Sequence, residues 1–167
     1  MARPHRLVDA VLSVLRAATA PAARRPATRR TATPRSQAPS GIDVEYRPRA
    51  DGRPDPGEVV WAWVPYDEGD GRGKDRPVLV VGRRGGDLVG LMLTSRDHDR
   101  DAADEARHGR SWMDVGTGGW DSRGRPSEVR LDRLLTLDPA RVRREGAALD
   151  RALFGRVVEA ARRTQGW

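Results

Sequence analysis

Apolar and polar residues follow a short-period pattern after residue 56, and this pattern predicts a β-rich domain. Residues 58–64 alternate bulky and small side chains and end at Pro65. Residues 77–81 and 88–93 are almost wholly apolar, and the glycine-containing turn at 82–86 between them predicts a hairpin. Shorter strands are expected at 111–115, 128–131 and 134–137, with a long charged loop at 95–110 and an irregular glycine-rich segment at 116–126.

The spacing becomes helical toward the end of the chain. Asp138 followed by Pro139 is the usual start of a helix, which we expect to end near Gly146. A second helix is expected from Asp150, and its apolar face consists of Leu153, Phe154, Val157, Val158 and Ala161. The predicted fold is mainly β, a small half-open barrel with a C-terminal helix packed on it.

The first 54 residues differ in composition from the rest. Residues 6–18 have the spacing of a short amphipathic helix, whereas residues 21–54 are rich in Pro, Ala, Arg, Thr and Ser. Such a segment cannot bury enough apolar surface to offset the entropy of ordering, so we expect disorder. The sequence thus predicts an N-terminal arm at 1–54 and a domain at 55–167. The arm is interpreted as a variable linker, as a basic RNA-binding segment, or as a segment that docks on a partner or on the domain.

The net charge of +7 comes from this arm alone. Residues 1–50 hold ten arginines against three acidic residues, whereas the 21 basic and 21 acidic residues after them cancel. Bulk charge therefore gives no reason to assign nucleic-acid binding, to RNA or to DNA, to the domain, and any basic patch there must be local.

Two classes of protein are disfavoured. The chain has no cysteine, which excludes disulfides and thiolate metal sites. It has no run of 18 apolar residues, so we expect no membrane span. The apolar stretch at 7–15 is interrupted by Asp9 and is short for a signal peptide, so a cytoplasmic protein is expected.

Reactive side chains occur at four strand ends of the predicted sheet. They are Glu58, Arg76, the pair Thr94 and Ser95, and the pair Arg130 and Asp132. Each has an ordinary structural explanation when it is considered alone, such as a surface ion pair or the end of a strand.

Together, four blocks in this order resemble the MazF/PemK toxin family. The blocks are residues 56–61, 76–81, 91–95 and 128–132, and a further match follows at 136–138. The resemblance extends over nearly all of residues 56–164 and leaves out the arm.

The resemblance implies a fold and an activity. Members of the family are toxins of type II toxin–antitoxin pairs that fold as SH3-like barrels and act as homodimers. They cleave single-stranded RNA at short sequences, usually without metal or other cofactor, and a cognate antitoxin protein silences them. The family's functional residues fall on Arg76, Thr94 and Ser95, its Arg-x-Asp acid–base pair on Arg130 and Asp132, and its opening glutamate on Glu58.

One feature of the family pattern is missing. Some members carry a histidine in the loop before the arginine of the second strand, whereas this loop, residues 68–74, has an aspartate or an arginine near that place. We expect Glu58, Arg72 and Lys74 to contact substrate. The same is expected of Trp112 and Trp120, which flank the glycine-rich segment and could stack on bases. The missing histidine leaves open a relative on the same fold that binds nucleic acid or protein without catalysis.

The chemistry constrains the roles. Metal-free RNA cleavage by the 2′-hydroxyl needs a proton acceptor, a proton donor and positive charge at the phosphate. Asp132 is a reasonable acceptor, whereas Arg76 and Arg130 suit electrostatic stabilisation because arginine hardly releases a proton.

Two further groupings occur in the loop after Ser95. His98 and His108 could be an acid–base pair, although surface histidines are the simpler interpretation. Asp97, His98, Asp99 and Asp101 could ligate a metal, but they lack a recognised ligand spacing and suit a solvated acidic loop.

Overall fold

The computed structural model describes residues 41–98 and 102–167. The predicted helix at 6–18 and the segment at 21–40 lie outside these residues, as do Asp99 and Asp101. The elements in chain order are β1 (Asp43–Val44), β2 (Glu58–Pro65), β3 (Gly73–Arg84), β4 (Asp87–Thr94), α1 (Ala102–Arg107), β5 (Trp112–Gly116), β6 (Ser127–Arg130), β7 (Leu135–Leu137), a 3₁₀ turn (Pro139–Arg141), β8 (Arg143–Ala148) and α2 (Arg151–Gln165).

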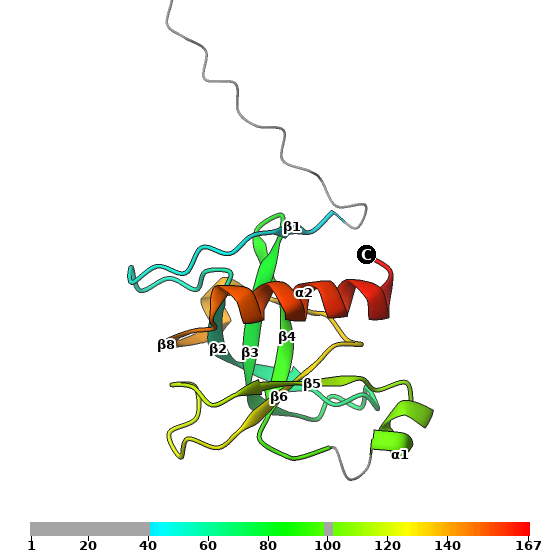
Figure 1. Ribbon diagram of the computed structural model, residues 1–167. Coiled ribbons are helices and arrows are strands. Elements are labelled where there is room, and N and C mark those ends of the chain that lie inside the picture. The colour runs from blue at the N-terminus through cyan, green and yellow to red at the C-terminus, as the bar shows by residue number, and fades with distance from the viewer. Residues whose placement is uncertain (1–40, 99–101) are drawn as a thin grey trace, which may run out of the picture. The chain divides into compact units, whose positions relative to one another are not determined.

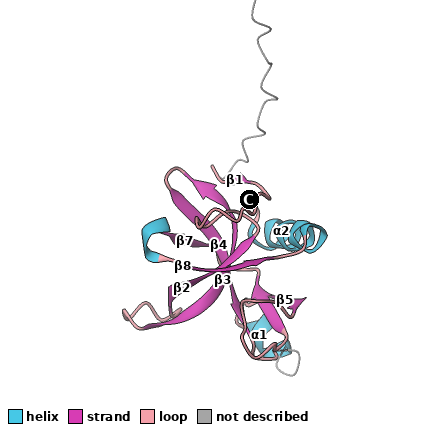
Figure 2. Ribbon diagram, turned by 90° about the vertical axis from the view of Figure 1, so that its left-hand side faces the viewer, coloured by secondary structure: helices cyan, strands magenta, loops and turns pink. Residues whose placement is uncertain are grey.

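The strands form one curled antiparallel sheet in the order β5-β6-β4-β3-β2-β8, with β1 paired to β3 and β7 paired to β4. The β3–β4 hairpin predicted from the apolar blocks is present, and a bulge between Val80 and Gly82 bends β3. Because β3 bends here and the strands twist, β3 and β4 extend from one end of the half-barrel to the other. Figure 2 shows β1 and β5 at opposite ends of the molecule.

Apolar side chains on the two faces of the central strands form two cores. On one face α2 packs over the sheet through Phe154, Val157, Val158 and Ala161. Figure 1 shows α2 running across β2, β3 and β4. The opposite face encloses Val60, Ala62, Val64, Val78, Val80, Leu88, Met92, Leu135 and Leu137. The predicted mainly β half-barrel with a C-terminal helix is therefore confirmed.

Helix α2 begins and ends where its local sequence predicts. The Asp150 carboxylate accepts the backbone N–H groups of Ala152 and Leu153, each at 3.0 Å. Gly166 closes the helix in the left-handed region at φ 73°, and its N–H donates to the carbonyl of Arg162.

The predicted helix from Asp138 to Gly146 is wrong beyond its first turn. Asp138 caps the 3₁₀ turn through the N–H of Ala140, but Val142 is extended and the chain continues as β8. Strand β8 pairs with the outer edge of β2, which would otherwise expose unpaired backbone groups. The gain from this sheet pairing outweighs the local helical signal.

The expectation of disorder up to Pro54 is wrong for residues 41–54. Ile42 is 2% exposed in the core beneath α2, and Tyr46 stacks edge-on against Phe154. Strand β1 lies so close to β3 that a Cβ on Gly82 would sit 2.5 Å from the Asp43 carbonyl oxygen, so only glycine fits there. The domain therefore includes residues from Gly41 onward.

The segment 95–110 is not wholly a loop, because it contains the short helix α1. Helix α1 lies beside β5 at the end of the molecule away from β1 (Figures 1 and 2).

Candidate functional site

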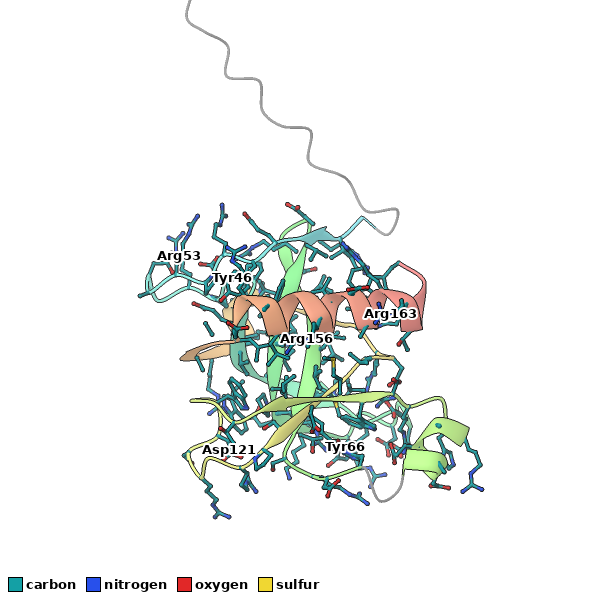
Figure 3. The ribbon with its side chains drawn as sticks, in the orientation of Figure 1. Tyr46, Arg53, Tyr66, Asp121, Arg156 and Arg163 are labelled. Carbon is teal, nitrogen blue, oxygen red and sulfur yellow. The ribbon has the colours of Figure 1, made fainter. Side chains whose placement is uncertain are left out.

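A cleft of about 930 Å³ is lined by residues of β5 and β6 and of the segments that lie against them. In Figure 3, Tyr66 and Asp121 of the cleft wall lie below these strands, whereas Arg156 of α2 lies above them. The wall is built from the β2–β3 loop, the start of β3, the end of β4, and β5 and β6. Of the residues that the sequence predicts, the cleft brings together Arg72, Lys74, Arg76, Thr94, Ser95, Trp112, Trp120 and Arg130.

Glu58 does not belong to this wall. Its carboxylate is buried, 2% exposed, and accepts the backbone N–H groups of Arg49 and Asp55. This arrangement holds the turn that leads into β2. The prediction that Glu58 contacts substrate therefore has no support from its position.

Arg76 lies in β3 and is half-buried in the cleft wall. It forms no hydrogen bond or ion pair with the residues that the structure describes. Its planar fork of donors is therefore free for an anion from outside, and phosphate fits that fork.

Thr94 and Ser95 stand where β4 ends. Thr94 is 9% exposed, and its hydroxyl accepts the N–H of Arg96 at 3.1 Å. Ser95 is exposed on the cleft. The strand end thus presents hydroxyl groups beside Arg76's strand, because β4 pairs with β3.

Arg130 is surrounded by carboxylates. Its Nε and Nη2 donate to Asp132, the closest contact being 2.8 Å from Nη2 to Oδ2, and its Nη1 donates to Asp67 Oδ2 at 2.8 Å. Burial acts to lower the pKa of Arg130, but the hydrogen bonds and charges of Asp132 and Asp67 raise it above its ordinary value. Arg130 therefore stays charged and is no proton donor.

Asp132 is turned toward Arg130 rather than into the cleft. It does not line the cleft, and its Oδ1 also accepts the backbone N–H of Ser111 at 2.9 Å. Both of its oxygens are thus engaged, which suits a group that orients Arg130.

Asp67 is a site residue that the sequence analysis missed. This loop carboxylate binds Arg130, binds Arg133 Nη1 at 2.8 Å, and lies 3.7 Å from Arg110 Nε. Partial burial acts to raise the pKa of Asp67, but the hydrogen bond from Arg130 and the charges of the three arginines hold it below its ordinary value. The ion pairs of Asp67 therefore hold the β2–β3 loop against the arginines near the cleft.

His98, which the sequence offered as half of an acid–base pair, lies in the wall of the cleft. It is 8% exposed, its Nδ1 lies 2.7 Å from Glu128 Oε2, and its ring stacks on Trp112 at 4.0 Å and 3°. The interpretation of His98 as a surface histidine is wrong, because Glu128 and Trp112 enclose it. His108 is exposed at the end of α1 and does not line the cleft, so the predicted acid–base pair of the two histidines is not assembled.

The two cleft tryptophans are partly committed to the fold. Trp120 is 4% exposed and donates through Nε1 to Ser127. Trp112 donates through Nε1 to Glu105 of α1 at 2.9 Å, and one of its faces is covered by His98. The hydrogen bond from Trp112 and the charge of Arg110 outweigh burial and lower the pKa of Glu105. A base could therefore stack only on a ring face that these contacts leave uncovered, or touch the edge of a ring without stacking.

Two absences apply to residues 41–98 and 102–167. No helix there is long and apolar enough to cross a membrane. No three His, Asp or Glu side chains there are grouped so that they could hold a metal ion.

Comparison with known proteins identifies the family. Residues 55–164 match the family described as PemK-like, MazF-like toxin of type II toxin-antitoxin system. The chain belongs to this family. The match begins three residues before β2 and ends inside α2, so it contains the whole cleft.

A solved structure shows the same fold. The crystal structure of MazF (Form-I) from Deinococcus radiodurans is 21% identical, covers 70% of this chain and 100% of that chain, and has a TM-score of 0.50. The MazE-MazF structure (Form-II) from the same organism is 22% identical over 70% of this chain and 95% of that chain, with a TM-score of 0.42. No curated protein matches the chain. The predicted PemK/MazF membership and fold are thus confirmed.

Proposed function

We propose that this member of the PemK/MazF family is a metal-independent endoribonuclease, an mRNA interferase that cleaves single-stranded RNA at short sequences. The supporting observation is that Arg76, which has no partner among the described residues, shares one cleft with Thr94, Ser95 and Arg130. Because its proposed target is RNA, we propose that the protein acts in the cytoplasm.

Phosphate binding would fall mainly to Arg76. Its guanidinium offers two parallel donors to phosphate oxygens, and the hydroxyls of Thr94 and Ser95 add neutral hydrogen bonds. Arg72 and Lys74 are exposed on the wall of the cleft and would extend the contact along the RNA backbone. Trp112 and Trp120 would contact bases at the wall.

Cleavage would proceed by attack of the 2′-hydroxyl on the adjacent phosphate. Arg130, fixed by Asp132, would supply positive charge to the phosphate as negative charge develops on its oxygens. The engagement of both Asp132 oxygens makes Asp132 a positioning residue for Arg130 in this proposal rather than the proton acceptor.

The family also suggests partners. A toxin of this kind would act as a homodimer and would be silenced by an acidic antitoxin segment in the cleft. The contact of Asp67 with Arg130 supports this mode of silencing, because it places a carboxylate where an antitoxin carboxylate could bind. The crystal structure of a MazE-MazF pair is one of the similar structures.

A second candidate is a non-catalytic relative that binds RNA or a protein in the same cleft. The occupation of Arg130 by two carboxylates of the chain favours it. Parallel binding and cleavage assays on a labelled single-stranded RNA separate the two. Loss of cleavage in Arg76→Ala but not in Arg84→Ala, an exposed arginine at the other end of β3, supports the endoribonuclease. Binding of intact RNA without any cut product supports the second candidate.

A further inference from the structure

His98 is held in the cleft by two groups at once. Glu128 accepts its backbone N–H through Oε1 at 3.2 Å and contacts its Nδ1 through Oε2 at 2.7 Å. The indole of Trp112 lies parallel to the imidazole at 4.0 Å. Both the rotation and the tilt of the ring are therefore fixed.

The carboxylate at Nδ1 decides where the ring accepts a proton. A carboxylate can only accept there, so Nδ1 carries hydrogen and the lone pair of neutral His98 lies on Nε2. Nε2 makes no hydrogen bond with the described residues, and it is not one of their buried unpartnered atoms. Because His98 lines the cleft, this acceptor is available to a bound molecule.

The strand register brings His98 to the phosphate-binding residues. Glu128 stands directly opposite Thr94 in the β4–β6 pair, and Trp112 stands opposite Arg130 in the β5–β6 pair. Residues opposite each other in an antiparallel pair have neighbouring side chains on one face. The two groups that hold His98 are thus neighbours of Thr94 and Arg130.

We propose that His98 is the proton acceptor for the 2′-hydroxyl of the RNA, and that Glu128 and Trp112 are its positioning residues. This inference rests on the proposed endoribonuclease function and replaces Asp132 in the acceptor role. A carboxylate that orients a histidine, which in turn takes a hydroxyl proton, is an arrangement that recurs in enzymes.

The step balances without metal or cofactor. The 2′-hydroxyl gives its proton to Nε2 while its oxygen forms the new bond to phosphorus. The bond from phosphorus to the 5′-oxygen breaks, and that oxygen keeps the electron pair and takes a proton from water. The imidazolium returns its proton to the resulting hydroxide, leaving a 2′,3′-cyclic phosphate and a 5′-hydroxyl.

Charged side chains of both signs lie near the His98 imidazole, which suits a ring that takes up a proton and then releases it. Among the described residues, the carboxylates of Glu128 in β6 and Glu105 in α1 face the imidazole. Arg130 of β6 lies 6.0 Å from the centre of the Trp112 ring. Cleavage is expected to fall at acid pH, because a proton acceptor must be unprotonated to take the 2′-hydroxyl proton.

The first test compares His98→Gln with His108→Gln, which changes the exposed histidine just after α1, in the full chain. His98→Gln is expected to lower kcat about a hundredfold or more, with KM changed by less than about threefold, and to remove the acid side of the pH profile. His108→Gln is expected to match the wild type. Glu128→Gln should lower kcat less than His98→Gln and displace the acid side, which a purely structural role would not do.

If His98→Gln does not fold, a second measurement tests whether His98 is the proton acceptor. The chain has three histidines, so the variant His5→Gln, His108→Gln keeps only His98. Diethylpyrocarbonate should abolish its RNA cleavage, hydroxylamine should restore it, and bound RNA should protect it. Cleavage that survives full modification, or an unchanged kcat and pH profile in His98→Gln, overturns the role of His98 while the endoribonuclease stands. A wild type that cuts no RNA at any pH overturns the proposed function itself.

Discussion

Arg130 Nη1 donates to Asp67 across 63 residues of sequence, at 2.8 Å from Oδ2. The same carboxylate contacts Arg133 and Arg110, so one acidic residue of the β2–β3 loop draws three arginines together. Under the proposed function, an RNA phosphate would have to compete with the Asp67 carboxylate for these arginines.

Asp67→Asn is expected to raise the affinity for single-stranded RNA about fivefold at 0.1 M salt. A charge interaction at 4 Å in water is worth about 1 kcal/mol, which corresponds to that factor. The affinity should also depend more steeply on salt, because the freed arginines contact more phosphates. Fluorescence anisotropy with a labelled RNA measures both effects. Asp87→Asn removes the same charge at the start of β4 and should leave them unchanged; equal effects in the two variants argue against the loop contact.

The ion pairs of Asp67 also predict how stability depends on pH. Its pKa is lower in the folded chain than the ordinary value of 3.8, so it stabilises the fold above that value and the contribution disappears as the pH falls below it. The wild type should therefore lose more stability than Asp67→Asn between pH 5 and about pH 2. Urea midpoints at several pH values test this, and parallel losses in the two proteins would contradict it.

Arg76→Ala is expected to lower RNA cleavage about a hundredfold or more without lowering the melting temperature. The loss of positive charge at the phosphate explains the first effect. The second follows because Arg76 has no partner among the described residues whose loss could destabilise the fold. Cleavage rates and thermal unfolding of Arg76→Ala and Arg84→Ala check the pair of expectations. A large drop in melting temperature for Arg76→Ala would show a structural role instead.

Ile42→Ala is expected to destabilise the domain by about 2–5 kcal/mol, the range for removing a buried large aliphatic side chain. Ile42 is 2% exposed against the core under α2, although it lies in a segment whose composition predicts disorder. Arg53→Ala, at an exposed position of the same segment, should change stability by less than about 0.5 kcal/mol. Urea unfolding measures both variants, and equal stability would mean that residues 41–54 do not belong to the folded domain.

The sequence predicts those parts of the fold whose signals are local. The cap at Asp150 and the apolar face through Phe154 and Val157 lie within the helix that they predict. The β3–β4 hairpin likewise needs only two neighbouring apolar blocks and a turn. Strand β8 is different, because it forms where the edge of β2 needs a partner, and no local pattern at 143–148 reports that need.

The same limit applies to the site. Arg76, Thr94 and Ser95 stand at predicted strand ends, so their meeting in the cleft could be anticipated. The contact of His98 with Glu128 joins residues 30 positions apart, and its loop gives no period or motif that predicts the pairing. Such pairs become visible only when the register of β4 with β6 is known.

The central claim is most directly tested by incubating the full chain with a mixed-sequence single-stranded RNA in EDTA and mapping the ends of the products. The account predicts cuts at a short recurring sequence that leave a 2′,3′-cyclic phosphate on one side and a 5′-hydroxyl on the other. RNA that stays intact, or cuts that need a divalent metal and leave a 5′-phosphate, would contradict it.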